Sequence, residues 1–360
     1  MPGAYYAASG AVKEVRANMA EEKHYENDPR IGALTERRYA ASDTDWHIDA
    51  AMTELSIQFN MDDSMYLGTS VLPTVPVAKQ SDRYVVWDKD YWFRIPDTLR
   101  APGTRPNRIE TSVGSLGYYC NNWALEETIP FEWLENSDVA FDLEASTARH
   151  IMQGLRLGLE NRIATLFTTA ANVGSGNALT GTAQWSDRAN SDPVSDVSTG
   201  RGWIQKETGQ RPNTIVVGQE VHDALILHPD IIDRVKYTQR ADNATIEAAL
   251  ADILMGKGGG RYFVGGAPKQ NAAEGLPTSA SSMTYIWGKT ATLLFVPSVP
   301  GRNLPSAAYA FRWKPAGFSD FVIETKDDDD IKARIKRVNY FQDERVTASQ
   351  LIYLLSTVVA

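Results

Sequence analysis

Cysteine is almost missing from this chain: Cys120 is the only one among 360 residues. A single thiol excludes an internal disulfide framework, and its place in a strand-like aromatic run predicts a buried thiol rather than a catalytic nucleophile. Long apolar runs are missing as well, since none approaches the roughly 20 residues that span a bilayer. The N-terminal stretch carries charges and has no apolar segment of a signal peptide. We therefore expect a protein of a reducing cytosol, with no membrane partner.

An excess of positive charge is also lacking. The chain has 36 lysines and arginines against 45 aspartates and glutamates, which gives a formal charge of −9 and a pI of about 5.2. Tight binding of double-stranded DNA usually relies on Lys and Arg side chains that neutralise phosphates. The composition therefore argues against a dedicated DNA-binding protein and fits a surface that lies near DNA without holding it.

The sequence lacks the patterns of the common active sites. No Gly-x-Ser-x-Gly elbow occurs, and the five histidines show no metal-ligand spacing. The Gly-Lys-Thr at 288–290 is similar to the end of a phosphate-binding loop, but Met283 stands where the first glycine is needed and a strand-like run follows. We predict no catalytic, metal or cofactor site and no enzyme activity, with His222 and His228 at the surface or at helix ends.

One long segment contains no proline. Residues 137–170 have their first glycine at Gly154, and apolar residues recur every three or four positions, which predicts an amphipathic helix capped by Ser137 and Asp138. About thirty helical residues would reach roughly 45 Å, against roughly 11–12 residues in a typical helix. The predicted buried stripe is Phe141, Ala145, Ala148, Met152, Leu155, Leu159, Ile163 and Leu166, and the predicted polar face is Arg149, Gln153, Arg156 and Glu160.

Residues 71–130, by contrast, are rich in proline and in strand-forming residues. Prolines between 73 and 106 exclude a helix, whereas β-branched and aromatic residues at 84–87, 91–93 and 118–128 predict strands. The pattern indicates a long two-stranded excursion with a charged tip. Because an isolated hairpin is only marginally stable in water, we expect it to lie on something else. The basic residues available for such a contact are Lys89, Arg94, Arg100, Arg105 and Arg108.

The remaining segments predict an arm and a mixed body. Residues 1–70 indicate an extended arm with at most one short helix near 48–57, and terminal disorder is the alternative. From 171 to 320, strands and helices alternate, as in an α/β or α+β domain. One of these helices is expected to start at Asp192 and Pro193, a cap residue followed by proline at the first helical position.

The C-terminal strands alternate between apolar and basic residues. Ile331, Ala333 and Ile335 form one face of a predicted strand, and we expect the apolar stripe of the long helix to pack on this face. Four adjacent carboxylates precede the strand and lack the spaced ligands of a calcium loop. They are either a solvated turn or a docking point for basic residues of another subunit. These carboxylates are Asp327, Asp328, Asp329 and Asp330.

The order of these parts resembles a tailed-bacteriophage major capsid protein of the HK97 fold. Local phrases contribute to the resemblance: 67–76, 123–130, 142–144, 185–187, 191–193, 211–214 and 228–237. The resemblance implies an α+β subunit with an N-terminal arm at 1–70 and an extended β-hairpin, the E-loop, at 71–130. A peripheral domain with the long spine helix and an antiparallel sheet would occupy 131–190 and 319–360, and a mixed α/β axial domain 191–318.

The same resemblance implies a structural role. Such a chain would assemble through hexamers and pentamers into an icosahedral shell that encloses double-stranded DNA, held by weak, non-specific proximity. Its partners would be further copies of itself, a scaffolding protein or protease, a portal and a decoration protein. It would assemble in the host bacterial cytoplasm and reside in the virion capsid. An encapsulin-like protein compartment is the nearest alternative, and a soluble oligomeric α/β enzyme is the more distant one.

Some relatives cross-link an E-loop lysine to an asparagine of a neighbouring subunit. Lys89 is the sole lysine between Asp82 and Glu110. No partner asparagine or catalytic acid is identifiable, so we do not expect this chemistry.

Overall fold

The computed structural model describes residues 61–360, apart from 88, 111–112, 137–142, 237–242, 257–259, 273–281, 298, 300–303 and 316–320. Residues 58–360 form one compact unit. The expected short helix near 48–57, most of the expected arm and the expected cap residues Ser137 and Asp138 lie outside the described residues. Within them, no helix is both long and apolar enough to cross a membrane.

Two five-stranded sheets organise this unit. The first, here called the spine sheet, has the order β1-β11-β13-β12, with β4 also paired to β13. Its longest strand, β13, pairs with β11 through one half and with β12 through the other, so it runs the length of the sheet. The strands are β1 (Thr74–Val77), β4 (Asn121–Pro130), β11 (Ala308–Trp313), β12 (Val322–Asp328) and β13 (Ala333–Val346).

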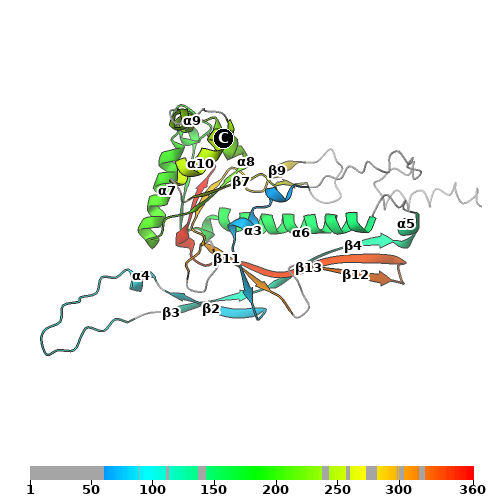
Figure 1. Ribbon diagram of the computed structural model, residues 1–360, viewed down its shortest axis with the longest axis horizontal. Coiled ribbons are helices and arrows are strands. Elements are labelled where there is room, and N and C mark those ends of the chain that lie inside the picture. The colour runs from blue at the N-terminus through cyan, green and yellow to red at the C-terminus, as the bar shows by residue number, and fades with distance from the viewer. Residues whose placement is uncertain are drawn as a thin grey trace, which may run out of the picture. The chain divides into compact units, whose positions relative to one another are not determined.

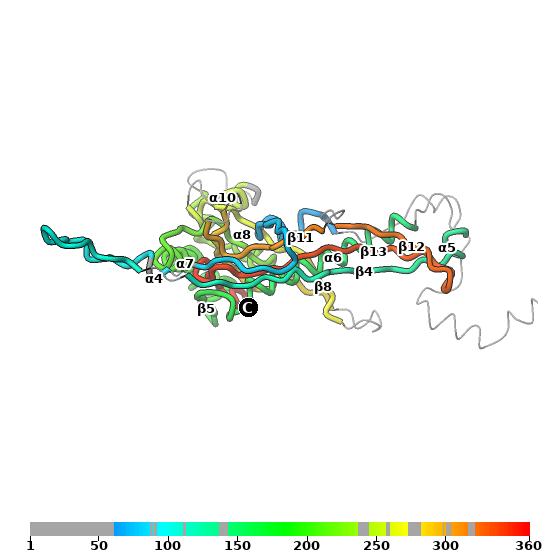
Figure 2. Tube along the Cα trace, turned by 90° about the horizontal axis from the view of Figure 1, so that it is seen from below, coloured from blue at the N-terminus to red at the C-terminus, as the bar shows by residue number. Residues whose placement is uncertain are grey.

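The predicted long helix is present as α6 (Leu143–Thr168), 26 residues long. It runs along β4 and β13 of the spine sheet (Figures 1 and 2). Ile151 and Leu155 of the helix form a buried cluster with Val338 and Tyr340 of β13. The expectation that the helix packs on the C-terminal strands is therefore confirmed.

The predicted face of β13 was wrong. Side chains alternate along a strand, and the face that holds Val338 and Tyr340 also holds Lys336, whose Nζ lies 2.6 Å from Glu144 of α6. Ile331 lies before the strand and is 57% exposed, and Ala333 and Ile335 belong to the other face. The basic residues can face the helix because α6 supplies a carboxylate at that position.

The predicted stripe of α6 was partly right. Leu155, Leu159 and Ile163 are buried, as expected, and so are Ile151, Ala164 and Phe167, which were not predicted. Glu160 was assigned to the polar face but is only 1% exposed. The reason is that the C-terminal half of α6 belongs to a second core as well, so more of its circumference is covered than one stripe.

That second core surrounds the other sheet, here called the body sheet, with the order β5-β14-β10-β6-β7. Every residue of β6 and β10 is buried, as expected for central strands with helices on their faces. The sheet and its helices gather at the C-terminal end of α6 (Figure 1). The strands are β5 (Ser175–Ala178), β6 (Thr214–Gly218), β7 (Arg261–Gly265), β10 (Ala291–Leu294) and β14 (Ile352–Ser356), and the helices are α7 (Pro193–Thr208), α8 (Gln219–Ile226), α9 (Pro229–Lys236) and α10 (Asn243–Met255).

Local signals set the ends of α7 as the sequence predicted. The Asp192 carboxylate accepts the backbone N–H of Ser195 at 2.9 Å, and Pro193 occupies the first helical position. The helix ends at Gly209, whose φ of 69° lies in the left-handed region that glycine adopts without steric cost.

Several strands lie in a different sheet from the one that the expected boundaries imply. β14 was expected among the peripheral strands of 319–360, but it pairs with β10 and β5 in the body sheet. β11 falls within 191–318 yet pairs with β1 and β13 in the spine sheet, and β5 falls within 131–190 yet pairs with β14. The chain therefore passes between the two sheets more often than linear boundaries allow.

The predicted excursion is a hairpin of β2 (Ser81–Trp87) and β3 (Val113–Tyr119). Its outgoing run is not a single strand, because Cys120 separates β3, which pairs with β2, from β4, which pairs with β13. The expected strand at 91–93 is wrong, since α4 (Lys89–Trp92) is a helical turn. Residues 93–110 contain no further helix or strand.

The base of the hairpin packs on the face of the spine sheet that is opposite α6. The Tyr118 and Phe311 rings are stacked with centroids 4.6 Å apart, and Cys120 is buried with its Sγ 3.3 Å from the carbonyl oxygen of Phe311. Burial raises the pKa of Cys120 to about 11, so the thiol stays protonated. The predicted burial of this cysteine is confirmed.

The remaining short elements connect these parts. They are α3 (Gly68–Val71), α5 (Phe131–Asn136), the hairpin of β8 (Pro268–Gln270) and β9 (Met283–Tyr285), and the 3-10 turns Asp63–Met65, Ala170–Asn172, Gly181–Ala183 and Ser349–Leu351.

Candidate inter-subunit surfaces

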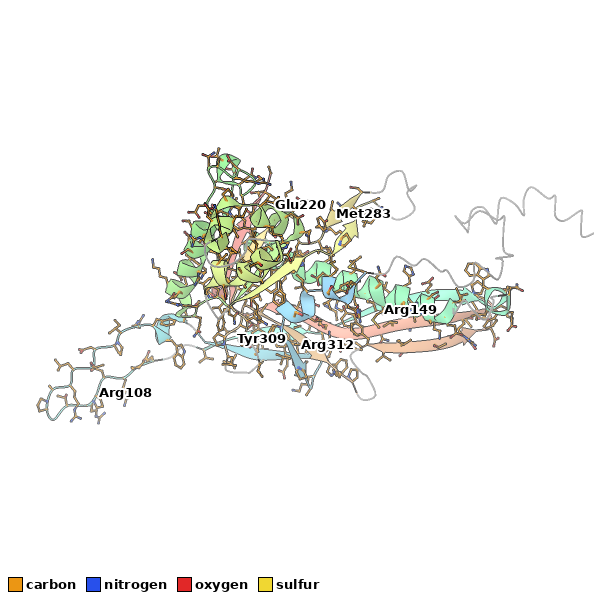
Figure 3. All side chains as sticks on the ribbon, turned by 45° about the horizontal axis from the view of Figure 1, so that its top comes forward. Arg108, Arg149, Glu220, Met283, Tyr309 and Arg312 are labelled. Carbon is orange, nitrogen blue, oxygen red and sulfur yellow. The ribbon has the colours of Figure 1, made fainter. Side chains whose placement is uncertain are left out.

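The loop at 93–110 carries apolar side chains that nothing in the described chain covers. Ile95 is 94% exposed, Leu99 84% and Ile109 70%. Burying such side chains against another surface contributes about 25 cal/mol per Å² of apolar area, and exposed apolar groups gathered on one segment mark interaction sites. The loop projects from the β2–β3 hairpin away from both sheets (Figures 1 and 3). Its position and its apolar surface indicate a contact with another molecule.

The predicted basic residues of this loop stand among those apolar side chains. Arg94, Arg100, Arg105 and Arg108 are all exposed, and Figure 3 shows Arg108 on the projecting loop. Arginine presents a rigid planar fork that matches a carboxylate. The loop therefore combines a non-directional apolar contact with directional cationic ones, and we call residues 93–110 the projecting loop.

Lys89 does not belong to this exposed set. Its Nζ lies 2.6 Å from Oε2 of Glu207 near the end of α7, and this hydrogen bond lowers the pKa of Glu207. Phe93 lies against Gly209 at the end of the same helix, 3.6 Å from the position that a Cβ would take. Lys89 therefore holds the root of the projecting loop on its own chain, where the sequence had suggested a contact with a neighbour.

The acidic run lies at the turn between β12 and β13. Asp327 accepts two hydrogen bonds from Arg334, at 2.7 and 3.2 Å, and Asp328 accepts the backbone N–H of Asp330 at 3.0 Å. Asp329 lies 3.5 Å from Lys332. Arg334 lowers the pKa of Asp327, so Asp327 is an internal ion-pair partner. Asp328 is half-buried at the end of β12, and Asp329 and Asp330 are exposed at the turn.

The structure does not bring the projecting loop and the acidic run together within one chain. The loop lies beyond the β2–β3 hairpin, whereas the β12–β13 turn lies at the opposite end of the spine sheet (Figure 1). A contact between them, as the sequence suggested, would need two copies of the chain, and it stays a prediction.

The side chains of Ser191, His228 and Asp230 are arranged in the order of a catalytic triad, but their hydrogen bonds run in the wrong direction. The Ser191 Oγ lies 3.0 Å from Nε2 of His228, and Nδ1 of His228 lies 3.7 Å from a carboxylate oxygen of Asp230. The Ser191 hydroxyl, however, donates to the carbonyl oxygen of Asp187 at 2.7 Å, and the backbone N–H of Asp230 donates to His228 Nδ1 at 3.3 Å. Because Nδ1 accepts that N–H, Nε2 carries the ring proton and donates to the Ser191 hydroxyl. The ring therefore has no free nitrogen in position to take the serine proton.

These contacts instead cap a helix. His228 precedes α9 and its ring accepts an N–H of the first turn, which is the role of a cap residue. The helix-end role predicted for His228 is confirmed, although the side chain is buried rather than at the surface. His222 is buried too and its Nδ1 lies 2.8 Å from the Tyr262 hydroxyl. Among the described residues, no group of His, Cys, Asp and Glu is arranged to hold a metal ion.

Two charged residues of α6 were missed as structural sites. Glu160 accepts hydrogen bonds from Gly68 and Trp287. Arg162 donates to the Tyr340 hydroxyl at 2.6 Å and lies 3.6 Å from the centroid of the Trp123 ring. Glu160 and Arg162 stand directly beside Leu159 and Ile163 of the predicted apolar stripe. This placement of two charges among apolar residues was a signal in the sequence that they are structural.

A long helix on a mostly antiparallel sheet, a projecting hairpin packed on the opposite face and a mixed α/β body define the fold of the protein. This α+β architecture is the HK97 fold. No family model matches the sequence. The chain is 28% identical over 288 residues to the major capsid protein of Burkholderia phage BcepMu, covering 77% of this chain and 87% of that protein.

Solved structures agree with this assignment. A phage-related protein from Bordetella bronchiseptica is 25% identical, with a TM-score of 0.62 over 83% of this chain and 93% of the other. The mature capsid of bacteriophage PhiM1 shares the fold with a TM-score of 0.56 at 12% identity, over 89% and 95% of the two chains. The predicted resemblance to tailed-phage major capsid proteins of the HK97 fold is confirmed in sequence and in fold, and the relatives are structural proteins rather than enzymes.

Proposed function

We propose that this chain is the major capsid protein of a phage and that it assembles through hexamers and pentamers into an icosahedral shell enclosing double-stranded DNA. The observation that carries the proposal is the projecting loop, where Ile95, Leu99 and Ile109 have no cover within the described chain. A surface of this kind on a subunit with a capsid fold is explained by a second copy that covers it. Closed symmetric assembly then satisfies every loop at once.

We assign the domains from the two sheets. The spine sheet with α6 serves as the peripheral domain, and the body sheet with α7, α8, α9 and α10 as the axial domain near the symmetry axes. Residues 1–70 act as the N-terminal arm. Each contact between copies can be weak, because a closed shell repeats it many times and the multivalent effect stabilises the whole.

The projecting loop of one copy would meet the acidic turn of a neighbour. An exposed ion pair contributes about 0–1 kcal/mol, so Arg100, Arg105 and Arg108 would set the position of the loop rather than supply most of the affinity. Apolar contacts of Ile95 and Leu99 supply the larger part of the binding free energy, because most of the apolar area of these side chains is exposed in the single chain and can be buried on contact. Asp328, Asp329 and Asp330 are the acceptors of choice, because Asp327 already binds Arg334.

Further partners follow from the same proposal. A scaffolding protein or protease would guide assembly in the host cytoplasm, a portal would occupy one vertex, and a decoration protein could bind outside. The net charge of −9 suits a lining over which DNA slides, because few phosphate contacts would form.

Electron microscopy of the purified full-length chain tests the proposal. We expect closed particles on the order of hundreds of ångströms across, as symmetric closure of many subunits requires. Small oligomers that never close, under any salt or concentration, would overturn it and favour the enzyme alternative. An encapsulin-like shell would also close, but it would carry protein cargo and no nuclease-protected DNA when isolated from its native host.

A further inference from the structure

The carboxylate of Glu160 lies where three separate parts of the fold meet. Oε2 accepts the backbone N–H of Gly68 at 2.7 Å, and Oε1 accepts Nε1–H of Trp287 at 2.6 Å. Gly68 begins α3, which leads into β1 of the spine sheet, Glu160 itself is on α6, and Trp287 belongs to the core of the body sheet. One side chain thus joins the arm-side segment at 67–72, the spine helix and the body.

The surroundings are shaped for this contact. A Cβ at Gly68 would lie 2.6 Å from Cδ1 of Ile163 and 3.0 Å from Oε2 of Glu160, so only glycine brings its N–H this close. A Cβ at Gly265 would collide with the Trp287 indole. Gly68 therefore brings its own N–H to the Glu160 carboxylate, and Gly265 leaves room for the Trp287 indole that donates the second hydrogen bond.

Burial makes this arrangement sensitive to its partners. Glu160 is 1% exposed, and a buried carboxylate that loses a donor retains its desolvation cost. Burial raises the pKa of Glu160, against the opposing effect of the Trp287, Gly68 and Leu67 donors. The Glu160 carboxylate has both of its hydrogen-bond donors only when residues 67–72, α6 and the body sheet are in contact at the same time.

We propose that Glu160 is a conformational lock that couples the seating of residues 67–72 to the contact between α6 and the body sheet. Moving the segment away removes one donor and weakens the hold of the carboxylate on Trp287. Moving the body away removes the other donor and loosens the segment. The two contacts are linked reciprocally, as any two interactions that stabilise one shared state must be. The inference does not depend on the proposed assembly.

Hydrogen–deuterium exchange of the full-length Glu160→Gln variant tests the lock. The amide is nearly isosteric, but it presents an NH2 group where the carboxylate presented an acceptor oxygen, so one of the two donors to Glu160 loses its acceptor. We expect exchange at 67–72 and at 286–290 to accelerate by about tenfold or more in both segments. Exchange in β6, a fully buried strand of the body sheet, should not change. Acceleration in only one segment, or in neither, overturns the proposal.

Faster exchange in β6 to the same extent would also overturn it, because Glu160 would then stabilise the whole fold rather than a junction. Glu144→Gln is the matched control on the same helix. Its partners are Arg334 and Lys336, so it should leave both junction segments unchanged.

Reciprocity gives the second test. Gly68→Ala should accelerate exchange at 286–290, and Trp287→Phe should accelerate it at 67–72, although neither residue is in the segment that responds. Trp185→Phe controls for a lost buried indole, since Nε1 of Trp185 donates to Asp196 within the body. If Trp185→Phe affects 67–72 as strongly as Trp287→Phe does, the response is general and the coupling is not specific to Glu160.

Discussion

The ammonium group of Lys336 lies 2.6 Å from Oε2 of Glu144, with the lysine side chain only 13% exposed. This contact lets the face of β13 that holds Val338 and Tyr340 meet α6, because a basic residue can be covered by a helix only where the helix supplies an opposite charge. Arg334 binds the other oxygen of the same carboxylate at 2.6 Å, and the two donors lower the pKa of Glu144. The start of α6 is thus fixed on the sheet by charge, and the later turns by apolar packing.

Replacing Glu144 by Gln should destabilise the subunit by about 1 kcal/mol, since two charge-assisted hydrogen bonds are weakened in a partly exposed site. Urea denaturation of the unassembled chain measures this difference. Glu127→Gln is the control, because its partner His150 is on the exposed side of α6. An equal effect of the two variants would show that the Glu144 contact has no special role in seating the helix.

Deleting residues 96–108, with a short Gly-Ser link in their place, should leave a folded subunit that assembles poorly. The deleted segment contains no helix or strand and its apolar side chains are exposed, so little internal packing is lost. Thermal unfolding of the unassembled chain checks the fold, and light scattering with electron microscopy checks assembly. Normal shells from the deletion variant would refute the role of the projecting loop.

A milder change separates the apolar contribution of the loop from its charge. Ile95→Ser combined with Leu99→Ser should raise the concentration needed for assembly more than Arg105→Gln combined with Arg108→Gln, because apolar burial outweighs exposed ion pairs. Sedimentation of assembled from unassembled chains at a series of concentrations measures both thresholds. The reverse order would show that the arginines dominate the contact.

Changing Asp328, Asp329 and Asp330 to Lys should weaken assembly more than it weakens the subunit. Asp327 is left intact, since its pairing with Arg334 stabilises the β12–β13 turn internally. The assembly threshold and the urea midpoint are measured on the same preparations. The control is Asp327→Lys alone, which should mainly lower the urea midpoint. A threshold unaffected by the triple change would show that the acidic run is only a solvated turn.

The cap at His228 predicts a pH dependence. Burial lowers the pKa of His228 despite the nearby charges of Asp230 and Asp192, so the folded state binds a proton less readily than the unfolded state, whose histidine pKa is about 6.5. The contribution of this neutral imidazole is therefore complete above about pH 6.5 and is lost as the pH falls towards the lowered value.

The variant His228→Asn keeps a side-chain acceptor for the helix end but cannot titrate in this range. Urea denaturation at about pH 7 and pH 5 should show a smaller loss of stability for the variant than for the original chain. Because His222 is buried with a lowered pKa as well, part of the acid effect should remain in the variant. Identical losses in both proteins would contradict the proposed role of the neutral ring.

The sequence by itself determined the local elements. A proline-free run with apolar residues at helical spacing became α6, the Asp192 and Pro193 pair began α7, and the lone Cys120 was buried. Each of these depends on neighbours within a few residues, namely on periodicity, on a cap or on a strand-forming run. The candidate contact residues also followed from the local sequence pattern. Only the tertiary structure showed that Lys89 binds Glu207 of its own chain, whereas the arginines of the projecting loop are exposed.

Only the tertiary structure decided which surfaces meet. A period of two in β13 gave two possible faces, and the face that meets α6 packs Val338 and Tyr340 on the helix and pairs Arg334 with Glu144, about 190 residues away in the chain. Glu160 belonged to the polar face of a helix packed on one sheet, but α6 is shared by two cores, so the second core covers that side. The helical spacing of apolar residues indicates only the face of the helix that packs on one neighbouring element. How much more of the helix is buried is set by long-range packing that no local spacing contains.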